Sequence, residues 1–180
     1  MNLINGEAII GFGESKINYE RINKMSYFDL QKALALAPNC NYYTTVGGKS
    51  DVDIAKSEQI LNLKFSRQCL DFYKKCGYLS FFGNEIFGIN PDNLAVLSGN
   101  SVAFALNDRE CYGLPLKWLP IYDFEDGNIA YLNYSSLNEE NEPPVISAFF
   151  DGENYIVTEQ ISEDLGSFIL MLVEKQLSKQ

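Results

Sequence analysis

The residues of this chain whose chemistry could support a function are carboxylates, and they form two clusters. One cluster flanks a predicted turn, and the other lies in the segment Asn-Glu-Glu-Asn-Glu-Pro-Pro that follows it. The clusters are Asp123, Glu125 and Asp126, then Glu139, Glu140 and Glu142. Two acids facing each other across a cleft could hydrolyse a glycosidic bond. Neighbouring acids in a turn can also be merely solvated, or can bind a partner, and we take partner binding as the hypothesis.

Histidine is absent from all 180 residues. The chain therefore lacks the usual general base at neutral pH and the commonest metal ligand. Its cysteines show no Cys-x-x-Cys spacing, so we expect reduced, buried thiols and no zinc site. Carboxylate, lysine or tyrosine chemistry stays possible, but the composition favours a protein that is not an enzyme and needs no cofactor. The four cysteines are Cys40, Cys69, Cys76 and Cys111.

The charge balance restricts the class of partner. The formal net charge is −10 and the pI is about 4.4. Such a protein repels the phosphate backbone of nucleic acids and the surface of an anionic membrane. It attracts basic proteins, although acidity can also serve solubility alone. The N-terminus lacks the basic and apolar regions of a signal peptide, so we expect a cytoplasmic protein.

Helices are predicted in the first part of the chain and at its end. Good helix formers precede Pro38, Ser50 is a natural N-cap, and Asn62 tolerates the left-handed backbone that ends a helix. Cys69, Phe72, Tyr73 and Cys76 follow helical spacing, and Gly77 ends that helix. The expected helices cover 26–37, 50–62, 66–77 and 101–112. A strand over 102–106 is the alternative to the last of these. A closing helix is expected to be capped by Ser162, with Glu163 and Asp164 in its first turn.

Strands are predicted between these helices. The aromatic segment 78–89 indicates one or two short strands, and two hairpins turn at Asp126-Gly127 and Asp151-Gly152. A further short strand is possible over 7–12. Helices, then strands, then a closing helix predict an α+β fold with a mostly antiparallel sheet. The hairpins pair 118–124 with 128–134 and 145–150 with 155–158.

One acid differs from the two clusters. Glu58 lies on the helical face that Ile54, Ala55 and Leu61 make apolar. A partly buried carboxylate needs hydrogen-bond partners. We therefore expect Glu58 to accept hydrogen bonds from loop amides within the helix pair, although a functional role stays open.

Short motifs follow one another along the chain: Gly47-Gly48-Lys49-Ser50-Asp51, then Ile54 and Glu58, the run from Leu61 to Ser66, Asp71-Phe72-Tyr73, Gly77, Glu85-Ile86-Phe87-Gly88, Tyr112-Gly113-Leu114-Pro115, Pro144-Val145 and Leu165-Gly166-Ser167-Phe168. Their order resembles the SUKH superfamily, the Smi/Knr-like immunity proteins. The resemblance covers about residues 25–180 and leaves 1–24 as an unassigned N-terminal extension. Asn62 stands where that family commonly has glycine, and Ser66 where it commonly has proline.

This resemblance implies a protein that binds and blocks a cognate polymorphic toxin, and it brings no catalytic residues. Together with the charge, it favours a basic, nuclease-type toxin as partner. The alternatives are a regulatory adaptor of the cell-wall or signalling type and, less favoured, a small carboxylate-dependent hydrolase.

Overall fold

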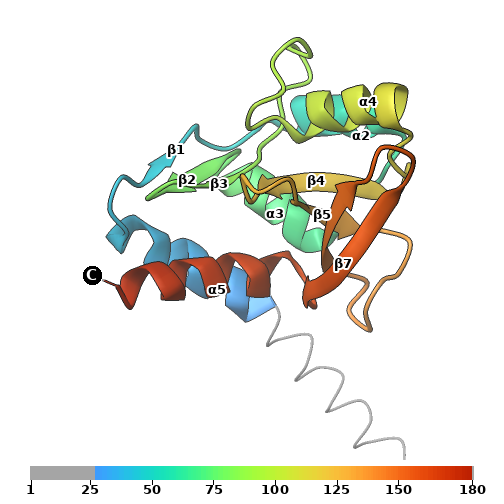
Figure 1. The fold of residues 1–180 in the computed structure, drawn as a ribbon. Helices are drawn as coiled ribbons and strands as arrows, with labels where there is room; N and C mark the ends of the chain where they lie inside the picture. Colours follow the sequence, from blue (N-terminus) through green and yellow to red (C-terminus); the bar gives the residue numbers. More distant parts are fainter. Residues whose placement is uncertain (1–26, 180) are drawn as a thin grey trace, which may run out of the picture.

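The computed structural model describes residues 27–179 of the chain (Figure 1). The proposed N-terminal extension 1–24 and the possible strand over 7–12 lie outside the described residues. The first described helix covers 27–36. The elements that follow it are η1 (Ala37–Asn39), β1 (Thr44–Thr45), α2 (Asp51–Leu61), α3 (Arg67–Lys75), β2 (Leu79–Phe81), β3 (Asn84–Ile86), α4 (Ser101–Tyr112), β4 (Trp118–Asp123), β5 (Ile129–Asn133), β6 (Val145–Phe150), β7 (Tyr155–Ser162) and α5 (Leu165–Leu177).

The expected α+β fold is confirmed, and all strand neighbours are antiparallel. Strands β1, β2 and β3 form a small sheet in that order, and β4 to β7 form a larger sheet in chain order. The amide of Phe87 donates to Ile121 O (2.8 Å) and so connects the end of β3 to β4. The helix 27–36 and α5 lie on one side of the strands, and α2 and α4 lie on the other (Figure 1).

The boundaries of α2 follow local chemistry. Ser50 Oγ accepts a hydrogen bond from the Asp53 amide (3.1 Å), and Asp53 Oδ2 accepts one from the Ser50 amide (3.2 Å). This capping box satisfies donors that the first helical turn leaves unpaired. At the other end, Asn62 adopts the left-handed conformation with φ +49°. Both ends of this helix were therefore predictable from residue types.

The start of α5 was predicted wrongly. Its N-cap is Asp164, whose Oδ1 accepts a hydrogen bond from the Ser167 amide (2.8 Å), and not Ser162. Ser162 remains in β7, where it pairs with Val145. Strand pairing thus extends β7 four residues beyond the expected Thr158 and moves the helix start two residues along. A sheet contact decided this boundary, because both Ser and Asp are good caps.

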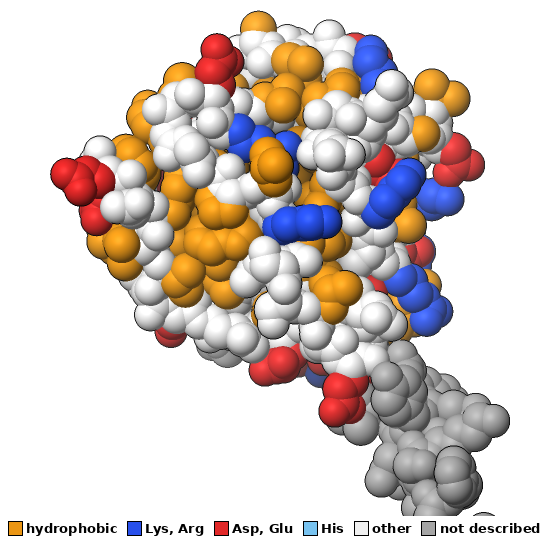
Figure 2. Space-filling model, turned by 90° about the vertical axis from the view of Figure 1, so that its right-hand side faces the viewer, with side chains coloured by type: hydrophobic (Ala, Val, Ile, Leu, Met, Phe, Trp, Pro, Cys, Tyr) orange, Lys and Arg blue, Asp and Glu red, His pale blue; other side chains and the backbone are white. Residues whose placement is uncertain are grey.

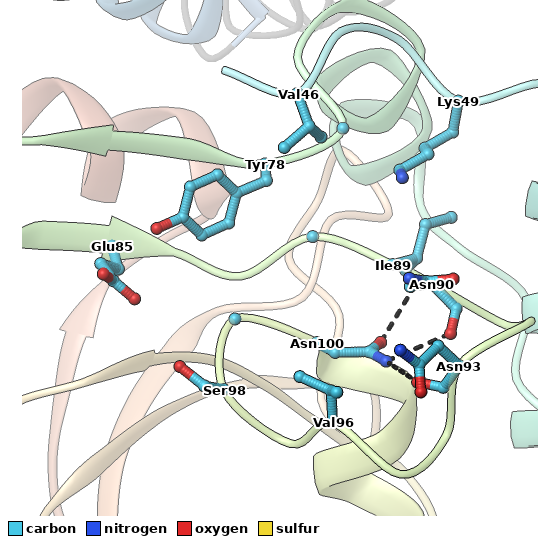
Figure 3. A pocket seen from close by; sticks show the side chains of 13 residues that line it. Val46, Lys49, Tyr78, Glu85, Ile89, Asn90, Asn93, Val96, Ser98 and Asn100 are labelled. Atoms are coloured by element: carbon cyan, nitrogen blue, oxygen red, sulfur yellow. Dashed lines mark hydrogen bonds between the residues drawn. The ribbon is translucent and has the colours of Figure 1, made fainter. Parts of the chain in front are cut away.

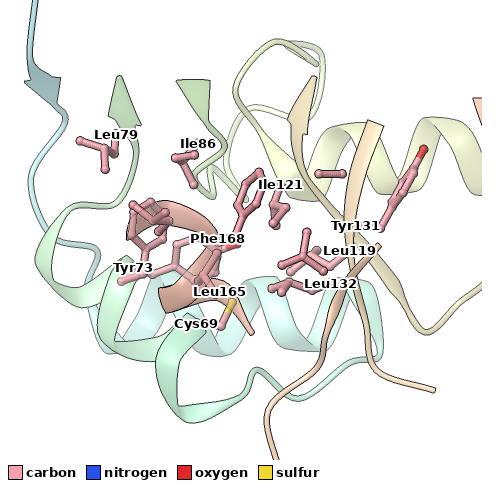
Figure 4. Packing of buried hydrophobic residues seen from close by; sticks show 14 of the residues in the cluster. Cys69, Tyr73, Leu79, Ile86, Leu119, Ile121, Tyr131, Leu132, Leu165 and Phe168 are labelled. Atoms are coloured by element: carbon pink, nitrogen blue, oxygen red, sulfur yellow. The ribbon is translucent and has the colours of Figure 1, made fainter. Parts of the chain in front are cut away.

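The core fills the space between the larger sheet, α3 and α5. Leu119 and Leu132 from the sheet lie close to Phe168 of α5 and Cys69 of α3 (Figure 4). Burial of the α3 stripe and of Trp118 confirms the expected core faces. The first helix packs tightly on α5, since a Cβ on Gly166 would lie 2.7 Å from Leu30 N. Glycine at this position is required for the close approach.

All four cysteines are free thiols, as expected, but only three are buried. Cys111 is exposed on α4, which corrects the expectation of a buried thiol at that position. None of the helices within 27–179 combines the length and the apolar character needed to cross a bilayer.

The capping box gives a direct stability test. Ser50→Ala should lower the free energy of unfolding by about 1 kcal/mol, because the Asp53 amide loses its acceptor. Chemical denaturation followed by circular dichroism would measure the change. The exposed residue Ser136 caps no helix, so Ser136→Ala is the matched control; equal stability of the two variants would contradict the assignment.

Candidate functional site

The larger sheet and its loops carry acidic residues and no basic ones. No lysine or arginine occurs between Lys117 and Lys175, a segment that contains all of β4 to β7 and most of α5. Most of its acids are exposed, and Glu142 and Asp164 are the buried exceptions. The acids of this segment are Asp123, Glu125, Asp126, Glu139, Glu140, Glu142, Asp151, Glu153, Glu159, Glu163, Asp164 and Glu174.

The first predicted cluster is an ordered acidic turn between β4 and β5. Asp123, Glu125 and Asp126 are all exposed there. Asp123 Oδ1 accepts a hydrogen bond from the Glu125 amide (2.7 Å), and Asp126 Oδ1 accepts one from the Asn128 amide (2.9 Å). The two hydrogen bonds from Asn128 lower the pKa of Asp126 below its ordinary value. Within 27–179 no ion pair neutralises these three acids.

Two of these acids line a pocket together with a third that the sequence analysis missed. Asp123, Glu125 and Glu85 of β3 surround a hollow of about 290 Å³ whose walls include Phe87 and Phe104. The two phenylalanine rings lie 5.9 Å apart, centroid to centroid. Glu85 belongs to β3 of the small sheet, so its position beside the β4–β5 turn depends on the contact between the two sheets. No local pattern in the sequence indicated that contact.

A second pocket of about 310 Å³ adjoins the first and shares Glu85 and Ser98 with it. Tyr78 and Glu85 lie on one side of this pocket, Lys49 on another, and Asn100 at its base (Figure 3). We call the two pockets together the acidic groove.

Glycines shape the floor of the acidic groove. A Cβ on Gly88 would lie 1.8 Å from Gly77 O, and one on Gly77, which has φ +67°, would lie 2.2 Å from Gly47 O. Only glycine allows these three backbones to meet at such distances. The motif glycines at 77 and 88 therefore have a packing role beside the groove, whereas a Cβ on Gly47 would meet nothing within 4 Å and its φ of +80° is what favours glycine there.

Asn100 holds the loop that forms one wall of the groove. Its Oδ1 accepts from the Asn90 amide (3.0 Å), and its Nδ2 donates to Asn90 O (3.1 Å) and Asn93 O (3.0 Å). Asn100 is also the N-cap of α4. A single buried side chain thus fixes the wall to the start of a helix, as the dashed lines in Figure 3 show.

The second predicted cluster does not join the first. The loop with Glu139 and Glu140 follows the end of β5, whereas the acidic turn precedes its start, so the two clusters lie at opposite ends of that strand. The clusters cannot form one continuous patch. Exposed apolar side chains instead lie at the acidic groove: Val46 and Val96 line it and are 59% and 49% exposed. Phe82, which precedes the lining residue Gly83, is 50% exposed.

Glu142 corrects the expectation of a surface acid. It is 3% exposed, and its Oε1 accepts a hydrogen bond from the Gln68 amide at the start of α3 (3.0 Å). Its Oε2 is buried without a well-formed hydrogen bond, as is the hydroxyl of the neighbouring Ser66. Burial raises the pKa of Glu142, because removal from water disfavours the charged form. The contacts with the Gln68 amide and Ser66 hold Glu142 inside the protein, so Glu142 cannot contact a partner directly.

Glu58 also makes a structural contact. Its Oε1 accepts a hydrogen bond from the Phe65 amide (2.9 Å), which is a loop amide within the helix pair. Lys64 pairs with the other carboxylate oxygen. Among residues 27–179, no group of three or more cysteine, aspartate or glutamate side chains is placed to hold a metal ion.

Comparison with known protein families identifies a relationship that covers most of the described chain. A SUKH family model described as SMI1-KNR4 cell-wall matches residues 51–169, which covers α2 to the first part of α5. No curated protein matches the chain.

The buried carboxyl of Glu142 predicts a pH-dependent stability. A raised folded-state pKa means that the folded protein binds more protons than the unfolded chain above about pH 4.5, so this group's contribution to stability falls as pH rises through its folded pKa. Glu142→Gln keeps an acceptor for the Gln68 amide and adds a donor for Ser66. We expect the free energy of unfolding of this variant, relative to the native protein, to increase from pH 4.5 to 7.5.

Urea denaturation across this pH range would measure the difference. Glu139→Gln is the control, since Glu139 is exposed and its removal should leave the pH dependence almost unchanged. A constant difference between native and Glu142→Gln proteins would contradict the assignment.

Proposed function

Since the chain belongs to the SMI1-KNR4 family of the SUKH superfamily, we propose that it is an immunity protein that binds a basic protein toxin and occludes its active site. The observation that carries this proposal is the larger sheet with its loops, in which most acids are exposed and no residue is basic. A surface of one charge attracts a partner of the other and orients its approach.

The acidic groove is the proposed anchoring site. A cationic side chain entering between Glu85, Asp123 and Glu125 would neutralise acids that no lysine or arginine of residues 27–179 pairs with. Its aliphatic stem would contact Phe87 and Phe104. Exposed Val46, Phe82 and Val96 offer the apolar contacts that usually dominate the centre of a protein interface.

This chemistry suits a toxin that acts on nucleic acids. Such an enzyme binds phosphates with a cationic groove, and carboxylates on a protein surface can occupy the same positions. No reaction is needed for inhibition, because a stable complex blocks access of the substrate. The proposed mechanism is therefore stoichiometric occlusion.

The hydrolase alternative requires two acids with different protonation states. Glu85, Asp123 and Glu125 line one pocket, but all three are exposed. A general acid at neutral pH usually needs an apolar environment that raises its pKa. The exposed positions thus favour electrostatic binding over acid–base chemistry. The family description favours the cell-wall adaptor as the second candidate, and a gene neighbourhood without a toxin would support it.

Co-expression tests the proposed function most directly. The toxin encoded beside the gene should arrest growth alone, and this protein should restore growth and co-purify with it at equal stoichiometry. A catalytically inactive toxin controls for the growth assay. Continued arrest together with the absence of a complex would reject the proposal.

Charge reversal tests the acidic groove. The double variant Glu85→Lys with Glu125→Lys should slow association by about tenfold at low ionic strength and weaken its salt dependence, because it removes attraction from the approach of a basic partner. Neither carboxylate accepts a hydrogen bond from a backbone amide in the described structure, so the fold should persist. Stopped-flow association at several salt concentrations would provide the rates.

Two matched variants locate the effect. Glu110→Lys on α4 changes charge outside the sheet, and it should have a smaller effect on the rate. Glu139→Lys with Glu140→Lys reports on the opposite end of β5; unchanged rates for this variant would remove that loop from the interface. Slowing in proportion to the change in charge, with Glu110→Lys giving half the effect of each double variant on the logarithm of the rate, would indicate net charge alone.

A further inference from the structure

Strand β7 leaves one edge of the larger sheet open. It is the last strand in the order β4-β5-β6-β7, and among residues 27–179 no strand pairs with its outer side. Residues 156–160 are all exposed, so this part of β7 is covered on neither face. Figure 1 shows β7 at the margin of the molecule. Eight residues of open strand edge form a template to which another strand can add.

The hairpin identifies which backbone groups face outward. The Asp151 amide donates to Asn154 O (3.0 Å), which makes these two residues a hydrogen-bonded pair. Pairs in an antiparallel ladder alternate between bonded and non-bonded. Tyr155, opposite Phe150, and Val157, opposite Ala148, are therefore in non-bonded pairs, and Ile156 is in a bonded one. The N–H and C=O groups of Tyr155 and Val157 thus point away from β6.

Apolar surface accompanies this open edge. Ile156 is 40% exposed and Val157 48% exposed, while Tyr112 at the end of α4 and Leu116 in the loop after it are 48% and 66% exposed. The Tyr112 and Phe150 rings lie 5.2 Å apart, which joins the end of α4 to the hairpin. Figure 2, which views the molecule from the side of α4 and β7, shows hydrophobic side chains gathered in a patch on this face. An incoming strand would find both backbone and side-chain partners here.

The charges near β7 indicate what kind of segment can bind at this edge. Glu153, Glu159 and Glu163 flank or belong to β7, and the strand has no lysine or arginine. A second copy of this chain would bring the same acids to the edge. Because each copy carries a formal charge of −10, the two would repel each other. An extended segment with lysine or arginine beside apolar residues would instead match both the acids and the exposed Ile156 and Val157.

We propose that β7 binds an extended basic segment of the partner protein as an added antiparallel or parallel strand. This inference rests on the proposed function and specifies how the partner docks: main-chain hydrogen bonds to Tyr155 and Val157 give affinity, and alternate side chains give specificity. The added strand extends the larger sheet beyond β7. The acidic groove lies beside the opposite margin of this sheet, at β4, so the two sites would contact separate parts of the partner.

Amide hydrogen exchange tests strand addition directly. The probe is the inactive toxin encoded beside the gene, mixed with this protein and compared with the free protein by NMR. Exchange at the Tyr155 and Val157 amides should slow by at least about tenfold in the complex. The Ile156 amide already bonds to β6 and serves as the internal control, with little change expected.

A substitution provides an independent measurement. Val157→Pro removes an outward N–H that β6 does not use, and edge strands tolerate proline at such positions. It should weaken binding by about tenfold, the effect of losing one interfacial hydrogen bond. Val157→Thr keeps the N–H and the β-branched shape, and it should bind almost normally. If Val157→Pro fails to fold, the exchange measurement on the native protein still decides.

The outcomes separate the two proposals. A complex in which the Tyr155 and Val157 amides exchange as fast as in the free protein overturns strand addition and leaves the immunity function intact. Slow exchange of both amides in the free protein, together with a dimer in sedimentation, also overturns it, since a second copy would then occupy the edge. The absence of any complex rejects the proposed function, and strand addition with it.

Discussion

A buried polar junction at the start of α3 holds the elements of this structure together. The Gln68 amide donates to Glu142 Oε1, and Gln68 Oε1 accepts from the Gly166 amide (2.6 Å). The Ser66 amide donates to Tyr134 Oη (3.2 Å). Each contact joins α3 to a segment at least 68 residues away, namely the loop after β5 and the start of α5. Because unpaired polar groups are costly inside a protein, these partners must meet for the core to close.

This junction explains how the larger sheet stays stable although its surface carries an excess of acidic residues. The core beneath the sheet is apolar and closely packed, and the junction connects it to α3 and α5. The acids on the outer surface contribute little to that packing. They cost some self-repulsion, which is small for exposed, screened charges. The surface can therefore carry the charge that a basic partner requires without compromising the fold.

Two distinct features are then available for binding, and they differ in kind. The acidic groove offers side-chain carboxylates and aromatic walls at the junction of the two sheets. The edge of β7 offers main-chain groups together with a few apolar side chains. The proposed binding role needs both strength and discrimination, and side-chain charges alone provide mainly fast association. Main-chain pairing at a fixed register adds orientation that charge does not supply.

Residue types along the chain determined the local elements: Ser50 and Asn62 set the ends of α2, Gly113 ended α4, and turn glycines placed the hairpins. They also determined the α+β class and the family, because the order of caps, glycines and apolar stripes can be read directly along the chain. Tertiary structure alone decided that Glu142 is buried, that Ser162 belongs to β7, and that Glu85 joins Asp123 and Glu125. The reason is physical: the environment of a carboxylate depends on segments distant in sequence, and no local spacing records which of them will pack against it.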